Sequence, residues 1–100
     1  MIRWMSVSRI ARGNAVAALK HAKEMAELAK KYEGVSSCSV YMDSFGDAGT
    51  IRYFMDFNDL ATFEGVQNQA LADDAYWKML EEAKDLFIEG STRNTVMRQL

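Results

Sequence analysis

Few side chains in this sequence could carry acid–base or nucleophilic chemistry, and they lie far apart along the chain. His21 is the only histidine, so a metal site built from several histidines is excluded. Its imidazole would titrate near neutral pH, so His21 is either a general base or a structural residue of a helix. Cys38 is the only cysteine and has no basic neighbour in the sequence to activate its thiol. We therefore expect Cys38 to be a buried apolar side chain and His21 to be the one catalytic candidate.

Charged residues near the ends of two expected strands form a second group. Asp43 and Asp56 could act together as a carboxylate pair, or each could belong to a turn or sheet edge. Arg52 shares a strand face with Phe54 and Asp56, which fits a cross-strand ion pair or an anion-binding side chain in a cleft. The chain has no dinucleotide-binding, P-loop, metalloprotease or nucleophile-elbow motif. We therefore expect no cofactor and no metal.

Two adjacent aromatic residues, Tyr76 and Trp77, raise a question of orientation. Neighbours on a helix point about 100° apart, so both cannot face one core. Apolar residues at helical spacing in residues 73–87 place Tyr76 near the middle of a stripe and Trp77 outside it, close to Ile88. Tyr76 is thus the expected core residue. Trp77 could pack on its own chain, lie in a subunit interface, or line a ligand pocket.

Length and composition set limits on the class of protein. A chain of 100 residues forms one domain, which we expect to span residues 1–100. Its 49% hydrophobic content is high for so small a protein, and self-association would hide the excess. With 12 basic and 14 acidic residues and no basic stripe, nucleic acid is not an expected partner. No apolar run is long enough for a membrane span, and one cysteine suits a reducing compartment, so we expect a cytoplasmic protein.

Hydrophobic periodicity predicts the elements that must position these residues. Alternation predicts strands, a helical apolar stripe between Asn14 and Gly34 predicts a long helix, and cap signals at Asn58 or Asp59 and at Asp73 predict two more. A glycine-rich break at residues 46–49 predicts a β-hairpin. The expected order is strand 2–10, helix 14–34, strands 35–45 and 50–57, helices 58–72 and 73–90, and strand 91–100. This βαββαβ order is typical of an α+β, ferredoxin-like fold with a four-stranded antiparallel sheet and helices on one face.

The predicted sheet has one face that its own helices would leave uncovered. Alternation places Met5 and Val7 on one face of the first strand, with Trp4, Ser6 and Ser8 on the other. In the hairpin, one face carries a mixture of polar and aromatic side chains. Its expected members are Ser37, Ser39, Tyr41, Arg52, Phe54 and Asp56. A mixed face of this kind suits a sheet that is partly covered from outside the domain.

The order of elements, the length and the segment "DLATFEGVQNQALADDAYWKMLEEAKDLFIEGSTRNTVMRQL" resemble the dimeric α+β-barrel superfamily. Within it, the turn "ADDAYWKML" is most similar to NIPSNAP-type members, and antibiotic-biosynthesis monooxygenases are also relatives. The resemblance covers nearly the whole chain and implies a homodimer in which two ferredoxin-like sheets pair through their open faces. It implies little about activity, because this fold hosts many functions.

Some members of this superfamily degrade haem, with an asparagine on the first strand and a tryptophan and a histidine in the second helical region. Trp77 stands in the place of that tryptophan. The first strand has no asparagine, however, and no histidine follows residue 21. The resemblance therefore does not predict haem chemistry here.

These observations lead to three hypotheses about function. The first is binding of a small, largely apolar molecule between helices and sheet, with Trp77 and Tyr53 as aromatic walls and His21 as a hydrogen-bonding group. The alternative is a cofactor-independent monooxygenase or isomerase that acts on an aromatic or polyketide-like substrate, with His21 as the base. The third is that the protein only dimerises and has no pocket.

Overall fold

The computed structural model describes residues 1–46 and 48–100; Asp47, in the predicted glycine-rich turn, lies outside the described residues. It has the predicted order of elements, with the second helical region divided in two. The strands are β1 (Ile2–Arg9), β2 (Ser37–Met42), β3 (Thr50–Phe57) and β4 (Arg93–Arg98). The helices are α1 (Ala15–Lys30), α2 (Leu60–Leu71) and α3 (Asp74–Glu82).

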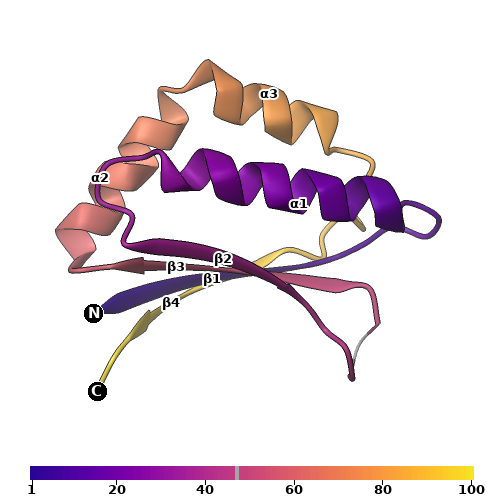
Figure 1. The fold of residues 1–100 in the computed structure, drawn as a ribbon, viewed down its shortest axis with the longest axis horizontal. Helices are drawn as coiled ribbons and strands as arrows, with labels where there is room; N and C mark the ends of the chain where they lie inside the picture. The colour runs from indigo at the N-terminus through magenta and orange to yellow at the C-terminus, as the bar shows by residue number, and fades with distance from the viewer. Residues whose placement is uncertain (47) are drawn as a thin grey trace.

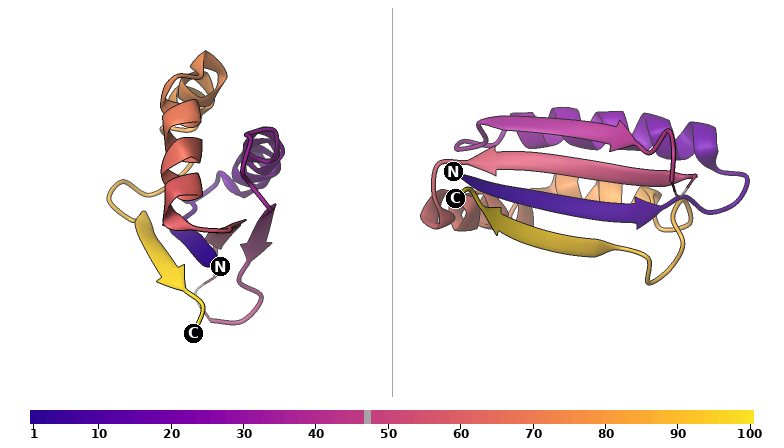
Figure 2. Two further views of the ribbon diagram at one scale, coloured as in Figure 1. Left: turned by 90° about the vertical axis from the view of Figure 1, so that its left-hand side faces the viewer. Right: turned by 90° about the horizontal axis from the view of Figure 1, so that it is seen from below.

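The four strands form one antiparallel sheet in the order β2-β3-β1-β4. This order confirms the α+β, ferredoxin-like prediction, because β1 and β3 are the central strands and β2 and β4 are the edge strands. All three helices lie on one face of the sheet, while the opposite face has no helix over it (Figures 1 and 2). None of these helices combines the length and hydropathy that a membrane crossing requires, within the described part of the chain.

Helix α1 lies against the sheet through its small residues. Ala18, Ala22 and Ala26 are buried, and alanine at this spacing allows the helix backbone to approach the strands closely. Asn14 occupies the N-cap position as predicted, but its side chain makes no capping hydrogen bond. Instead its Nδ2 donates to the carbonyl oxygen of Asp85 at 2.9 Å, which joins the start of α1 to the segment after α3.

The caps of the other two helices agree with the sequence signals. The Asp59 carboxylate accepts from the backbone N–H of Thr62, and that of Asp73 accepts from the N–H of Ala75. Helix α3 ends at Glu82, which is earlier than the predicted stop near Gly90. The physical reason is that residues 86–88 leave the helix to bond to the segment after β1, which the periodicity of residues 73–87 could not show.

The packed core is at one end of the space between helices and sheet. Ile2, Phe57 and Val66 form its buried cluster, and the Phe57 and Phe63 rings meet edge to face with centroids 5.2 Å apart. Trp4 and Tyr32 pack against this cluster and are only partly buried. The candidate site begins at this cluster, because Phe57, Phe63 and Val66 also line the cavity described below.

Candidate functional site

Helix α3 lies above α1 and α2 instead of on the sheet (Figures 1 and 2). Its N-terminus is fixed by the Tyr32 hydroxyl, which donates to Asp73 Oδ2 at 2.7 Å. The segment after its C-terminus is fixed to the end of β1, because the N–H of Ala11 donates to the Leu86 carbonyl at 2.9 Å and that of Ile88 to the Arg9 carbonyl at 2.8 Å. Because these contacts hold both of its ends, α3 crosses over the sheet without packing on it. A space remains between α3 and the sheet.

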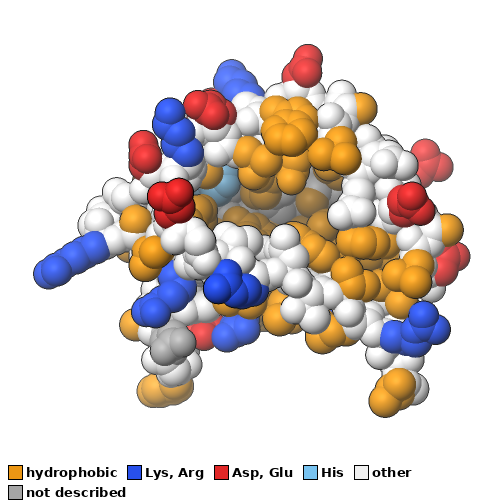
Figure 3. Space-filling model, turned by 180° about the vertical axis from the view of Figure 1, so that it is seen from behind, with side chains coloured by type: hydrophobic (Ala, Val, Ile, Leu, Met, Phe, Trp, Pro, Cys, Tyr) orange, Lys and Arg blue, Asp and Glu red, His pale blue; other side chains and the backbone are white. Residues whose placement is uncertain are grey.

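This space is a cavity of about 500 Å³ between the helix layer and the sheet. Its size is in the range of small-molecule sites. Figure 3 shows its mouth as a hollow bordered by hydrophobic side chains. The hypothesis that the chain has no pocket is therefore not supported by the structure.

Strands β1 and β3 form the floor of the cavity. Trp4, Ser6 and Ser8, which share one face of β1 as the alternation predicts, line it, and Tyr53 and Met55 line it from β3. Ser6 lies opposite Tyr53, and Trp4 lies opposite Met55, in the antiparallel register. The two serines on the buried side of a strand were a signal in the sequence that the helices would not pack tightly there.

Helix α1 contributes His21 and Met25 to the wall of the cavity. His21 is only 9% exposed, and its ring meets that of Phe87 edge to face with centroids 6.1 Å apart. It has no hydrogen-bond partner among the described residues. Burial lowers the pKa of His21, and the negative charges of Glu24 and Glu82 oppose this shift only in part. The imidazole is therefore neutral at neutral pH and can accept a hydrogen bond or a proton.

Tyr53, the second residue predicted for the site, also lines the cavity. Burial raises its pKa to about 12, so the phenol is protonated and acts as a neutral hydrogen-bonding group. Tyr76, the expected core residue of α3, lines the same cavity from above. The structure thus brings His21 and Tyr53 to one site, and Tyr76 joins them.

Trp77, the third residue predicted for the site, is not among the residues that line the cavity. Its side chain is 49% exposed, and its indole Nε1 donates to the carbonyl oxygen of Leu71 at 2.9 Å. That carbonyl belongs to the last residue of α2, where a helix has free acceptors. Of the three roles considered for Trp77, this contact favours packing on the neighbouring helix of its own chain. The aromatic wall expected from Trp77 comes from Tyr76.

Cys38 is buried on the helix side of β2 and lines the cavity, which agrees with the prediction of a buried apolar side chain. Burial raises the pKa of its thiol, while Lys30 opposes this shift only weakly. A protonated thiol is a poor nucleophile. Cys38 thus contributes surface to the cavity and no reactive thiolate. No group of three or more acidic, cysteine or histidine side chains in residues 1–46 and 48–100 could hold a metal ion.

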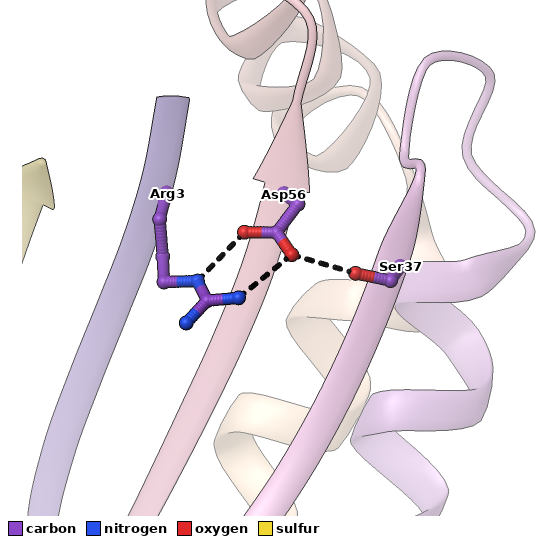
Figure 4. A network of polar contacts seen from close by, with 3 residues as sticks. All are labelled: Arg3, Ser37 and Asp56. Atoms are coloured by element: carbon purple, nitrogen blue, oxygen red, sulfur yellow. Dashed lines mark hydrogen bonds and ion pairs between the residues drawn. The ribbon is translucent and has the colours of Figure 1, made fainter. Parts of the chain in front are cut away.

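Two ion pairs occupy the open face of the sheet. Arg3 donates from Nε to Asp56 Oδ1 at 2.8 Å and from a terminal nitrogen to Oδ2 at 3.0 Å, and the Ser37 hydroxyl donates to the same Oδ2 at 3.0 Å (Figure 4). Arg52 donates from Nε to Asp43 Oδ1 at 2.9 Å. These contacts lower the pKa of both aspartates. Asp43 and Asp56 are therefore separate partners of two arginines, and the ion-pair interpretation of Arg52 is confirmed.

Known proteins share the architecture of this chain but little of its sequence. No family model and no curated protein matches it. Among solved structures, a NIPSNAP family protein with unknown function from Agrobacterium tumefaciens superimposes with a TM-score of 0.81 at 19% identity, over 99% of this chain and 87% of the other. A NIPSNAP domain protein from Burkholderia xenovorans gives a TM-score of 0.80 at 14% identity, over 100% of this chain and 95% of the other.

A structure described as an antibiotic biosynthesis monooxygenase is equally similar. Its TM-score is 0.79 at 12% identity, over 100% of this chain and 99% of the other. Identities this low show a common fold and nothing about shared activity. The predicted resemblance to NIPSNAP-type and monooxygenase-type proteins is thus confirmed at the level of the fold.

Proposed function

We propose that this protein binds a small, largely apolar molecule in the cavity between the helices and the sheet. The observation that carries the proposal is a cavity of about 500 Å³ walled by aromatic and sulfur-containing side chains in a chain of only 100 residues. Protein interiors are ordinarily packed to the density of organic crystals, so a void of this size marks a space for something else. Its apolar walls favour an apolar occupant.

Within this proposal His21 and Tyr53 contact the ligand. Tyr53 supplies an aromatic surface on the floor, Tyr76 supplies one from α3, and His21 offers a neutral imidazole. Trp4 and Phe57 continue the aromatic lining toward the packed core. Ring faces and edges of this kind pack well against flat apolar molecules.

We also propose that the protein is a homodimer that pairs through its open sheet face. That face carries Phe54 and the exposed ring of Tyr41, whose centroids lie 5.6 Å apart, and the Arg3–Asp56 and Arg52–Asp43 ion pairs neutralise much of its charge. The tip of the β2–β3 hairpin, with Phe45 97% exposed, extends beyond the sheet on this side (Figure 1). Such exposed aromatic residues beside neutralised charges are typical of a surface that becomes covered.

An enzymatic alternative has one observation in its favour. His21 is buried in the cavity wall, its side chain makes no hydrogen bond to the described residues, and its pKa is lowered, as a general base in a cofactor-independent monooxygenase or isomerase would require. An aromatic or polyketide-like substrate would suit the same walls. Under this alternative, His21→Gln abolishes turnover and leaves ligand affinity within about twofold, whereas a binding protein has no turnover to lose.

The proposal is tested by filling the cavity from α2. Ala70 lines the cavity and Ala61 is an exposed alanine of the same helix, so Ala70→Phe and Ala61→Phe add the same side chain at matched positions. Wild type and Ala61→Phe should bind the uncharged fluorescent probe N-phenyl-naphthylamine with an increase in its emission. Ala70→Phe should bind it at least about tenfold more weakly, because a ring occupies the site. No probe binding by wild type, or equal binding by both variants, would refute the proposal.

A further inference from the structure

The cavity floor changes from apolar to polar along the strands. In β1, Trp4 lies between Met55 of β3 and Val96 of β4, which makes an apolar row. Two residues further along, Ser6 lies between Tyr53 and Asn94, which makes a polar row. Beyond it, the Ser8 and Thr92 hydroxyls are hydrogen-bonded to each other at 2.8 Å. The site therefore has one apolar end and one end with hydrogen-bonding groups.

Helix α1 and the turn that follows it show the same gradient. Tyr32 packs against the apolar cluster of Ile2 and Phe57. His21 is within α1, nine residues before its last residue, Lys30, which is about 14 Å along the helix axis. There it contacts Phe87, which pairs with Ile10 just beyond the end of β1. His21 is thus at the polar end of the cavity.

Three groups at this polar end have no protein partner. The side chains of Ser6, His21 and Tyr53 make no hydrogen bond within the described residues. Among the described residues, the Thr50 hydroxyl is the one wholly buried side-chain polar atom without a partner. The polar atoms of Ser6, His21 and Tyr53 therefore each keep some accessible surface. Ser6 and His21 are nevertheless buried residues, so the surface they keep faces the cavity. Polar groups in such a position are ordinarily satisfied by a ligand or by water.

The charges around the cavity restrict the ligand further. Ser6, His21 and Tyr53 are all uncharged at neutral pH. Lys84 and Glu89 line the cavity too, but both are exposed, and the Lys84 ammonium is paired with Glu81 at 3.3 Å. A carboxylate brought to the polar end would lose its water and meet no resident cation among the described side chains there, which is costly.

We propose that the ligand is an uncharged amphipathic molecule, with an apolar ring body and a hydroxyl or carbonyl head that bonds to Ser6, His21 and Tyr53. The ring body lies over Trp4 and Met55, toward the packed core. This inference rests on the proposed function, because it concerns the occupant of the same cavity. It adds the direction in which the ligand lies and the kind of head group that the site accepts.

The test compares naphthalene, naphthol and naphthoate, which share a ring body and differ in the head group. Each is titrated against bound N-phenyl-naphthylamine at neutral pH. Naphthol should displace the probe about threefold to tenfold more effectively than naphthalene, as one to two added neutral hydrogen bonds allow. Naphthoate should be at least about tenfold weaker than naphthol, because its charge is left without a partner.

Tyr53→Phe should reduce the preference for naphthol over naphthalene to within about twofold, because the phenol hydroxyl that bonds to the head group is lost. Tyr41→Phe, the same change on the open face, is the matched control and should keep the full preference. Equal binding of naphthol and naphthalene to wild type, or tightest binding of naphthoate, overturns the head-group inference and leaves the proposed function intact. If neither the probe nor any of the three compounds binds, the proposed function fails and this inference fails with it.

Discussion

Ser6 and Tyr53 are direct partners across β1 and β3, and both side chains stand on the cavity floor without a hydrogen bond to the rest of the described chain. Two residues further along the strand, Ser8 is bonded to Thr92 at 2.8 Å. The two serines share a strand face and are both buried. They differ in that only the Ser8 hydroxyl has a hydrogen-bond partner within the described protein. Replacing each serine by alanine should therefore change the free energy of unfolding differently.

Ser6→Ala should leave the free energy of unfolding unchanged or raise it by up to about 1 kcal/mol, because it removes a hydroxyl that lines the cavity and has no hydrogen-bond partner among the described residues. Ser8→Ala should lower it by about 1 kcal/mol, because it leaves Thr92 without its bond. Urea denaturation of both variants measures the two values. A loss in Ser6→Ala as large as that in Ser8→Ala would show that the Ser6 hydroxyl is satisfied within the fold.

His21 should make stability depend on pH near neutrality. Its pKa in the folded protein is below the ordinary value of 6.5, so the unfolded chain takes up a proton first as the pH falls. The stability contributed by the neutral imidazole is therefore complete above the ordinary pKa of 6.5. It is lost as the pH falls through 6.5 toward the lower pKa of His21 in the folded protein. Urea denaturation of wild type between about pH 8 and pH 5 should show this loss.

His21→Gln, which cannot titrate, should remove the pH dependence in that range. The carboxylates with lowered pKa do not interfere, because their ordinary value is 3.8 and their contribution is lost only in more acidic solution. These carboxylates belong to Asp43, Asp56 and Asp59. Identical pH profiles of wild type and His21→Gln would contradict the buried, neutral imidazole.

Trp77→Phe should affect stability and not ligand binding. Phenylalanine keeps most of the ring packing against Tyr76 but loses the bond from the indole N–H to the Leu71 carbonyl. We expect a loss of about 1 kcal/mol in the free energy of unfolding and an unchanged affinity for N-phenyl-naphthylamine. A clear fall in that affinity with unchanged stability would place Trp77 at the ligand after all.

Phe54→Asp should separate the proposed homodimer. Phe54 is at the centre of the open face, between Arg3 and Tyr41, and a charge there would be buried without compensation in the dimer. Leu71→Asp, at an exposed position of α2, is the control. Sedimentation velocity should give a dimer for wild type and the control, and a folded species of 11.3 kDa for Phe54→Asp. Wild type that sediments at 11.3 kDa would rule out the dimer.

The fold could be predicted from the sequence because its elements are signalled locally. Alternation in residues 2–10 correctly groups Trp4, Ser6 and Ser8 on one face of the strand, although it does not indicate that the helices cover that face, and Asp59 and Asp73 mark two helix starts. The early end of α3 could not be predicted, because it depends on backbone bonds between residues 9–11 and 86–88 that are distant in sequence.

The candidate site was predictable only in part. The sequence predicts His21 and Tyr53 for the site from their types and their faces in the helical and strand patterns, and both line the cavity. Trp77 was expected at the site because it lies off the apolar stripe of its helix. That pattern excludes a core position, but it does not distinguish a ligand site from a contact with a neighbouring helix. The structure shows the second, because the indole N–H donates to the Leu71 carbonyl at the end of α2. Tyr76 lines the cavity because α3 is raised above the sheet, a feature set by contacts at both of its ends.

The central claim, that a small apolar molecule occupies the cavity, is tested most directly by the methyl signals of isotope-labelled methionines. Met25 and Met55 line the cavity, whereas Met5 lies opposite Phe54 on the open sheet face. Saturation with N-phenyl-naphthylamine should shift the Met25 and Met55 methyl resonances, through ring currents from the bound probe, and leave Met5 unchanged. Unchanged Met25 and Met55 resonances, or shifts confined to Met5, would contradict the account.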